Sequence, residues 1–141
     1  MLLPKKVKHR KCHKPRGRNE GVATSNNKLE FGDFGLKSKD HSRINSRQIE
    51  AARKVITRYI EKGGQMWTRI FPDRPVTEKG EEMPMGGGKG EPSYYACNVK
   101  PGTIMFEIGG IDEEDAQEAL IKAGHKLPLK VEFVTKDDFL I

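Results

Sequence analysis

The chain of 141 residues has few cysteines, few aromatic residues and no long apolar run. Two cysteines make no disulfide framework, and they favour a reducing compartment such as the cytoplasm. No stretch approaches the roughly 18 apolar residues that a membrane-spanning helix needs, so we expect no membrane partner. No apolar segment follows the basic N-terminus, so we expect no secretory signal. With 35% hydrophobic and 33% charged residues, the chain suits one domain with a small core.

The sequence also lacks the residue groupings that catalysis and metal binding require. No pair of carboxylates falls in a predicted cleft, so we expect no enzyme and no cofactor. His9, Cys12 and His13 lie close together, but no second pair of ligands accompanies them, and we expect no metal site. Cys97 lies in the middle of a predicted strand and is expected to be a small core residue.

The charge is unevenly distributed along the chain. Residues 1–58 hold 16 Lys and Arg against 5 Asp and Glu, a net charge of +11. Residues 59–141 hold 10 and 15, a net charge of −5. A basic first half on a mildly acidic second half predicts one surface that faces a polyanion.

We divide the chain into a basic N-terminal arm with a polar loop (1–28) and a single α+β domain (29–141). Residues 1–18 hold eight Lys and Arg and no acid, a pattern typical of arms that neutralise nucleic-acid phosphates. A solvated tail without a partner is the alternative. The candidate contacts in the arm are Lys5, Lys6, Lys8, Arg10, Lys11, His13, Lys14, Arg16 and Arg18.

The pattern of apolar residues predicts two helices packed on one mostly antiparallel sheet, in the order β-α-β-loop-β-β-α-β. Residues 39–46 are predicted to be a loop, and so are residues 74–92. A turn at Pro101-Gly102 predicts a hairpin of its two flanking strands. The second helix is predicted to begin after Asp112 and to stop at Gly124. The predicted strands are 29–38, 65–73, 93–100, 103–110 and 129–136.

The first helix carries the clearest local signals. Asn45 and Gln48 fit a capping box, and Ile44 and Ile49 fit a hydrophobic staple. Two glycines at 63–64 predict its end. The apolar stripe is Ile49, Ala52, Ile56, Tyr59 and Ile60.

Basic residues gather on and around this helix, opposed there by only Glu50 and Glu61. Unbalanced like charge on a helix favours an external anion, although solvated arginines are the common alternative. Trp67, Arg69 and Phe71 alternate on a predicted strand, where they suit either RNA stacking or the core. The candidate contacts of this region are Lys37, Arg43, Arg47, Arg53, Lys54, Arg58 and Arg69.

The segment "PMGGGKG" contains one lysine among glycines and invites comparison with a nucleotide-binding P-loop. The first glycine of that motif is replaced by Met83 and its Ser/Thr by Gly90, and a strand follows where a helix is required. Nucleotide binding is therefore excluded. A flexible connection and a loop that approaches another molecule both remain.

Five stretches together resemble the L-sixteen family of bacterial-type large-ribosomal-subunit proteins. One of them, "GQMWTRIFPDRPVTEKGEEMPMGGGKG" (64–90), contains the two most diagnostic motifs, "WTRIFP" (67–72) and "MGGGKG" (85–90). The others are "PKKVKHRKCHKPRGR" (4–18), "FGDFGLKS" (31–38) with "RQIEAARKVITR" (47–58), and "KLPLKVEFVTK" (126–136). They follow the family's order and cover most of the chain.

The resemblance implies a hammerhead-like α/β fold and a cytoplasmic ribosomal protein, encoded by a bacterium or an organelle. The implied partners are large-subunit rRNA near the peptidyl-transferase region, neighbouring ribosomal proteins, and A-site and P-site tRNA. The loop implied to lie near tRNA is Pro84, Met85, Gly86, Gly87, Gly88, Lys89 and Gly90. Pro84 departs from the family, which often has arginine there. A free-standing nucleic-acid-binding regulator is the second hypothesis, although no recognition helix supports it.

Overall fold

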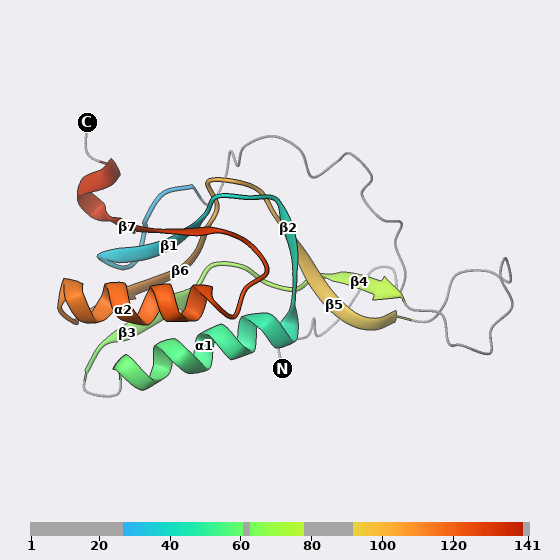
Figure 1. The fold of residues 1–141 in the computed structure, drawn as a ribbon, viewed down its shortest axis with the longest axis horizontal. Helices are drawn as coiled ribbons and strands as arrows, with labels where there is room; N and C mark the ends of the chain where they lie inside the picture. Colours follow the sequence, from blue (N-terminus) through green and yellow to red (C-terminus); the bar gives the residue numbers. More distant parts are fainter. Residues whose placement is uncertain (1–26, 61–62, 78–91, 140–141) are drawn as a thin grey trace, which may run out of the picture.

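The computed structural model describes residues 27–60, 63–77 and 92–139 (Figure 1). Its two helices and antiparallel strand pairs confirm the predicted α+β class. In chain order the elements are β1 (Phe34–Ser38), β2 (Ser42–Asn45), α1 (Ser46–Ile60), β3 (Gln65–Thr68), β4 (Arg74–Thr77), β5 (Pro92–Val99), β6 (Ile104–Gly109), α2 (Glu113–Gly124), β7 (Val131–Thr135) and a short 3-10 helix, η1 (Lys136–Phe139).

The strands form two sheets where the sequence predicted one. The larger sheet has the order β3-β6-β1-β7, and the smaller has the order β2-β5-β4. The chain therefore passes back and forth between the sheets: β1, β3, β6 and β7 join the larger sheet, while β2, β4 and β5 join the smaller. Alternation of apolar residues identifies a strand but does not identify its partner, which is why the division was not predicted.

The predicted hairpin of residues 93–100 and 103–110 is wrong, because β5 pairs with β2 and β4 while β6 pairs with β1 and β3. The turn itself is present. Thr103 N–H donates to the Lys100 carbonyl at 3.2 Å, and Gly102 has a φ of 93°, as a type II turn requires. The end of β1 is bound at this turn, where Gly102 N–H donates to the Ser38 carbonyl at 2.8 Å.

Several strand boundaries also differ from the prediction. The strand expected over 65–73 ends at Thr68, and β4 follows within the predicted loop. β4 is an edge strand, where Pro75 is tolerated because its missing N–H costs no ladder hydrogen bond. β2 occupies part of the segment expected to be a loop, 39–46. The first strand is confined to Phe34–Ser38, and its pairing with β6 shifts register between Leu36 and Lys37, as at a β-bulge.

The start of α1 is as predicted. Gln48 N–H donates to Asn45 Oδ1 at 2.9 Å, and Asn45 N–H donates to Gln48 Oε1 at 3.0 Å, which is the capping box. Ile44 and Ile49 are both fully buried in the core cluster. At the other end, the N–H groups of Gly63 and Gly64 both donate to the Ile60 carbonyl.

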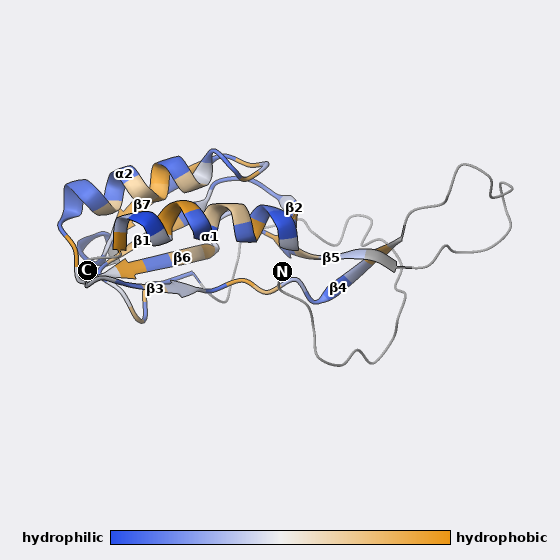
Figure 2. Cartoon of the chain, turned by 90° about the horizontal axis from the view of Figure 1, so that it is seen from below, coloured by the Kyte–Doolittle hydropathy of each residue, from blue (hydrophilic) through white to orange (hydrophobic). Residues whose placement is uncertain are grey.

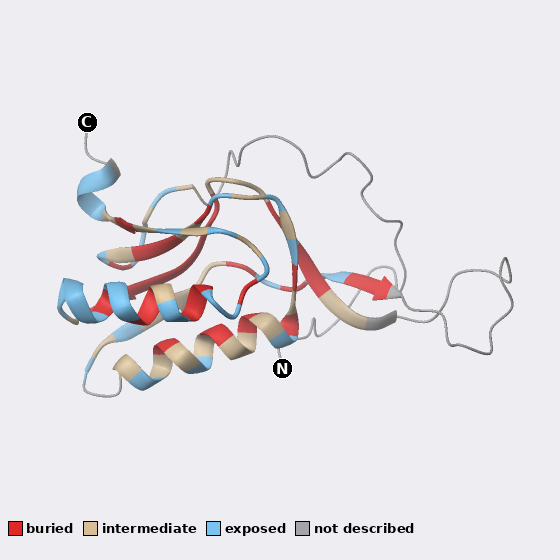
Figure 3. Cartoon of the chain, in the orientation of Figure 1, coloured by how far each residue is buried: buried red, intermediate tan, exposed pale blue. Residues whose placement is uncertain are grey.

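Both helices lie on one side of the larger sheet and contact each other along their length (Figure 2). α2 packs against β1 and β7, whereas α1 reaches β3. Buried residues run along β1, β6 and the sheet-facing side of each helix (Figure 3). Asp112 is the N-cap of α2 but makes no side-chain capping bond, and the helix ends at Gly124 as predicted.

Candidate nucleic-acid interface

Three cations share one exposed face of α1. Arg47, Lys54 and Arg58 are spaced seven and four positions apart, which places them in line along a helix. Their side chains have no ion-pair or hydrogen-bond partner among the residues that the structure describes, and neither has the exposed Arg43 of β2, which precedes them. We call Arg43, Arg47, Lys54 and Arg58 the α1 basic row.

Two other predicted contacts are already paired. Arg53 forms a bidentate contact with Glu50 one turn earlier, and this hydrogen bond holds the pKa of Glu50 below its usual value. Lys37 lies on β1 and its Nζ is 3.4 Å from Glu132 on β7. These cations therefore offer less unbalanced charge to an external anion than the α1 basic row does.

Arg69 has a structural role that the sequence did not indicate. Its side chain is only 8% exposed and it contacts Glu107, which is fully buried on β6. Burial raises the pKa of Glu107, but hydrogen bonds from the Gly32 N–H and from Arg69 outweigh it, so the net pKa is lowered and the carboxylate stays charged. The guanidinium of Arg69 is thus bound to Glu107 within the fold, and we omit Arg69 from the proposed RNA contacts.

The alternating pattern predicted one strand face with three side chains in line, those of Trp67, Arg69 and Phe71. This arrangement is not formed, because β3 ends at Thr68. Trp67 is half-buried and stacks on Phe31, while Phe71 is exposed. They are neither a buried core strip nor a continuous outer face.

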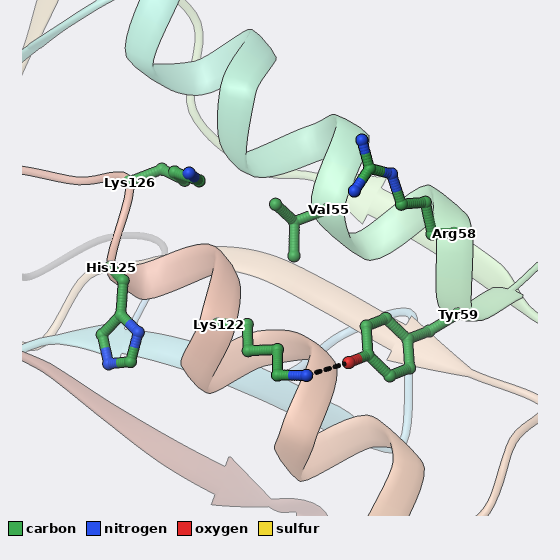
Figure 4. Close-up of a pocket in the computed structure, with 6 residues that line it drawn as sticks. All are labelled: Val55, Arg58, Tyr59, Lys122, His125 and Lys126. Atoms are coloured by element: carbon green, nitrogen blue, oxygen red, sulfur yellow. Dashed lines mark hydrogen bonds between the residues drawn. The ribbon is translucent and has the colours of Figure 1, made fainter.

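A groove of about 490 Å³ lies between α1 and α2 (Figure 4). Arg58 and Tyr59 line it from α1, and Lys122 lines it from α2. Lys122 Nζ donates to Tyr59 Oη at 2.8 Å and is also 2.9 Å from Glu118. The hydrogen bond to Tyr59, together with Glu118, raises the pKa of Lys122, so this lysine is charged at neutral pH. The full lining is Val55, Arg58, Tyr59, Lys122, His125 and Lys126. We call it the interhelical groove.

Lys122, His125 and Lys126 are not among the contacts predicted from the sequence. Lys122 lies in the last turn of α2 and Lys126 just beyond it, where a positive charge interacts favourably with the helix dipole, and that role explains the two lysines without any ligand. His125 and Lys126 follow the end of α2 at Gly124, so no helical spacing in the sequence connects them with Lys122. Their position beside Arg58 extends the α1 basic row onto α2.

The remaining candidates lie outside the described residues. These are the arm contacts, from Lys5 to Arg18, and the glycine-rich loop, Pro84 to Gly90. The structure does fix where this loop is attached, because Thr77 at the end of β4 pairs in register with Pro92 at the start of β5. The two ends of the segment 78–91 are therefore held side by side.

Cys97 is buried and free, as expected for a small core residue, and burial raises its pKa to about 12. Within residues 27–60, 63–77 and 92–139, no group of three or more His, Cys, Asp or Glu is arranged to hold a metal ion. In the same ranges no helix is long and apolar enough to cross a membrane.

Comparison with known families identifies the class of protein as ribosomal. The model of one family, described as Ribosomal protein L16p/L10e, matches residues 4–134. The match covers most of the 141 residues, and the chain belongs to this family. It is therefore a structural protein of the large ribosomal subunit, located in the ribosome, from a family that is generally non-enzymatic. Membership favours the ribosomal hypothesis over the free-standing regulator.

Proposed function

We propose that this protein binds large-subunit rRNA through the α1 basic row and the N-terminal arm. The observation that carries the proposal is that Arg43, Arg47, Lys54 and Arg58 are exposed and make no side-chain hydrogen bond or ion pair among the described residues. Like charges in a row repel one another, and phosphates offset that repulsion while releasing counterions. The family supplies the class of polyanion, which is rRNA.

We further propose that the bound protein lies near the peptidyl-transferase region and helps to position A-site and P-site tRNA. The support is the resemblance of Pro84–Gly90 to the family loop that reaches toward tRNA. The paired ends of β4 and β5 give this loop a fixed base. Lys89 is its one cation, and acids at 81, 82 and 91 surround it, so we expect the loop to contribute shape more than affinity.

The test of rRNA binding is the salt dependence of affinity for large-subunit rRNA. Arg47→Gln, Lys54→Gln and Arg58→Gln should each lower the log–log slope by about 0.7–0.9 per lost phosphate contact. Arg53→Gln should change it less, because Glu50 already neutralises that charge. In the arm, Arg10→Glu and Arg16→Glu should lower it as well.

Lys136→Gln is the matched control, since Lys136 pairs with Asp33 and follows β7, at the opposite edge of the sheet from β3 and α1. An unchanged slope in all three α1 variants would remove the α1 basic row from the interface. Sedimentation then tests the assembly: a tagged protein should travel with the large subunit through salt that strips peripheral proteins. For the loop, Lys89→Ala should spare rRNA binding but slow tRNA accommodation, and normal accommodation would refute its role.

A further inference from the structure

Phe31 projects from the loop before β1 with 54% of its surface exposed, although it is one of the largest apolar residues described. Its neighbour Gly32 is buried, and a Cβ there would lie 2.6 Å from the Ile108 carbonyl oxygen. The backbone beside Phe31 thus packs closely against β6, while the ring of Phe31 faces the solvent. Exposure at this position follows from how the loop is held.

The loop is held by a buried carboxylate. Glu107 Oε1 accepts three backbone N–H groups in succession, from Glu30 at 3.1 Å and from Phe31 and Gly32 at 2.9 Å. Its second oxygen contacts Arg69. Burying a charge is favourable only with such full satisfaction, so this arrangement fixes the loop in one conformation.

Side chains from and just beyond β3 support the ring. Trp67 stacks on Phe31 with 6.1 Å between ring centroids and 20° between planes. The Arg69 guanidinium carbon lies 5.1 Å from the Phe31 centroid, a cation–π distance. Phe31 is therefore a rigid aromatic surface, supported from within and open to solvent outside.

We propose that Phe31 is a stacking platform for an unpaired nucleobase of the rRNA. Proteins recognise single-stranded RNA by stacking its bases on aromatic rings and arginine planes, and a preorganised ring loses little entropy on binding. This inference rests on the proposed rRNA binding and adds a contact of a different kind, one that reads a base and not a phosphate.

The local charges support a base in preference to a phosphate or an apolar protein surface. Arg69 is neutralised by Glu107, and its Nη2 is 3.5 Å from Glu30; Asp33 pairs with Lys136 at 3.4 Å. These two cations and three carboxylates leave no net positive charge for a phosphate. Exposed charged residues on both sides of Phe31 leave a single ring and not the broad apolar patch that a protein partner uses.

The test uses Trp67, the only tryptophan of the chain, as a fluorescent reporter beside the platform. A short oligoadenylate should change its emission, whereas an abasic strand with the same phosphates should not. Phe31→Leu should weaken oligoadenylate binding about five-fold or more, the loss of one base stack, with an unchanged salt slope. Phe31→Tyr should retain binding.

Phe34→Leu is the matched control, because Phe34 stacks on Phe133 at 5.8 Å within the described fold, away from Trp67. Circular dichroism confirms that each variant is folded. Equal affinity of Phe31→Leu and the parent for oligoadenylate would overturn the platform, and so would an equal loss on the abasic strand. Normal RNA binding combined with weaker association with large-subunit proteins would assign Phe31 to a protein contact and overturn it too. If no variant and no parent binds rRNA in a salt-dependent way, the proposed function itself has failed.

Discussion

Asn45 and Gln48 exchange hydrogen bonds across the first turn of α1, each side chain accepting the backbone N–H of the other. This reciprocal pair satisfies two donors that a helix start leaves without an intrahelical partner. Because α1 carries the α1 basic row, the pair also fixes the position of the proposed RNA contacts.

Removing the cap should therefore destabilise the domain. We expect Asn45→Ala to lower the free energy of unfolding by about 1 kcal/mol. Asp112→Ala is the comparison, since Asp112 occupies the N-cap of α2 without a side-chain capping bond and should cost less. Urea unfolding followed by circular dichroism measures the free energy of unfolding of both variants. Equal losses of stability would mean that the two hydrogen bonds of the capping box contribute nothing.

Glu107 should make the free energy of unfolding depend on pH in the acidic range. Its folded-state pKa is lowered, so the unfolded chain binds the proton first as the pH falls. Its contribution is thus complete above the unfolded value of about 4.3 and is lost as pH drops through the folded value. The variant Glu107→Gln should be less stable at pH 7 and should lack this step. Identical pH slopes between pH 5 and roughly pH 2 in both proteins would contradict the assignment.

Cys97 should not react with thiol reagents while the protein is folded. Only the thiolate is nucleophilic, and a pKa of about 12 leaves almost none of it at pH 8. In a Cys12→Ser background, which leaves Cys97 as the single cysteine, a thiol reagent should react only after denaturant is added. Reaction in native buffer at the rate of free cysteine would show that the strand opens readily.

The interhelical groove should contribute to RNA binding if its cations contact further phosphates of the RNA that Arg58 contacts. We expect Lys126→Gln to lower the salt slope by about 0.7–0.9, as Arg58→Gln does. The double variant should lower it by the sum, because each removes a separate contact. Lys136→Gln again serves as the control. An unchanged slope in Lys126→Gln would leave that residue with its helix-dipole role alone.

The helices were predictable because their signals are local. A cap, a staple and an apolar stripe within residues 44–60 specify α1 without reference to the rest of the chain. Local signals do not determine strand pairing. Both partners of β6, namely β1 and β3, lie far from it in the sequence. The turn at Pro101-Gly102 is correctly encoded, but a turn reverses a chain without choosing the sheet that each side joins.

The candidate site residues show the same difference between local and long-range signals. Arg47, Lys54 and Arg58 share one face of α1, as their helical spacing predicts, whereas Arg43 of the α1 basic row lies on β2. The structural role of Arg69 was not predictable, because its partner Glu107 lies 38 positions away and no local pattern connects them. Phe31 was passed over for a similar reason: its outward position depends on a carboxylate on β6.

The division of consecutive strands between two sheets decides how this chain can be cut and rebuilt. Links at 39–41, 69–73 and 100–103 each carry the chain from one sheet to the other. The shortest contiguous fragment that contains the smaller sheet, residues 42–99, also includes α1 and β3 of the larger sheet, so the smaller sheet cannot be expressed as a separate module. The segment 78–91 is the opposite case. Thr77 and Pro92 are register partners at its base, so this segment can be exchanged or lengthened without shifting any other strand.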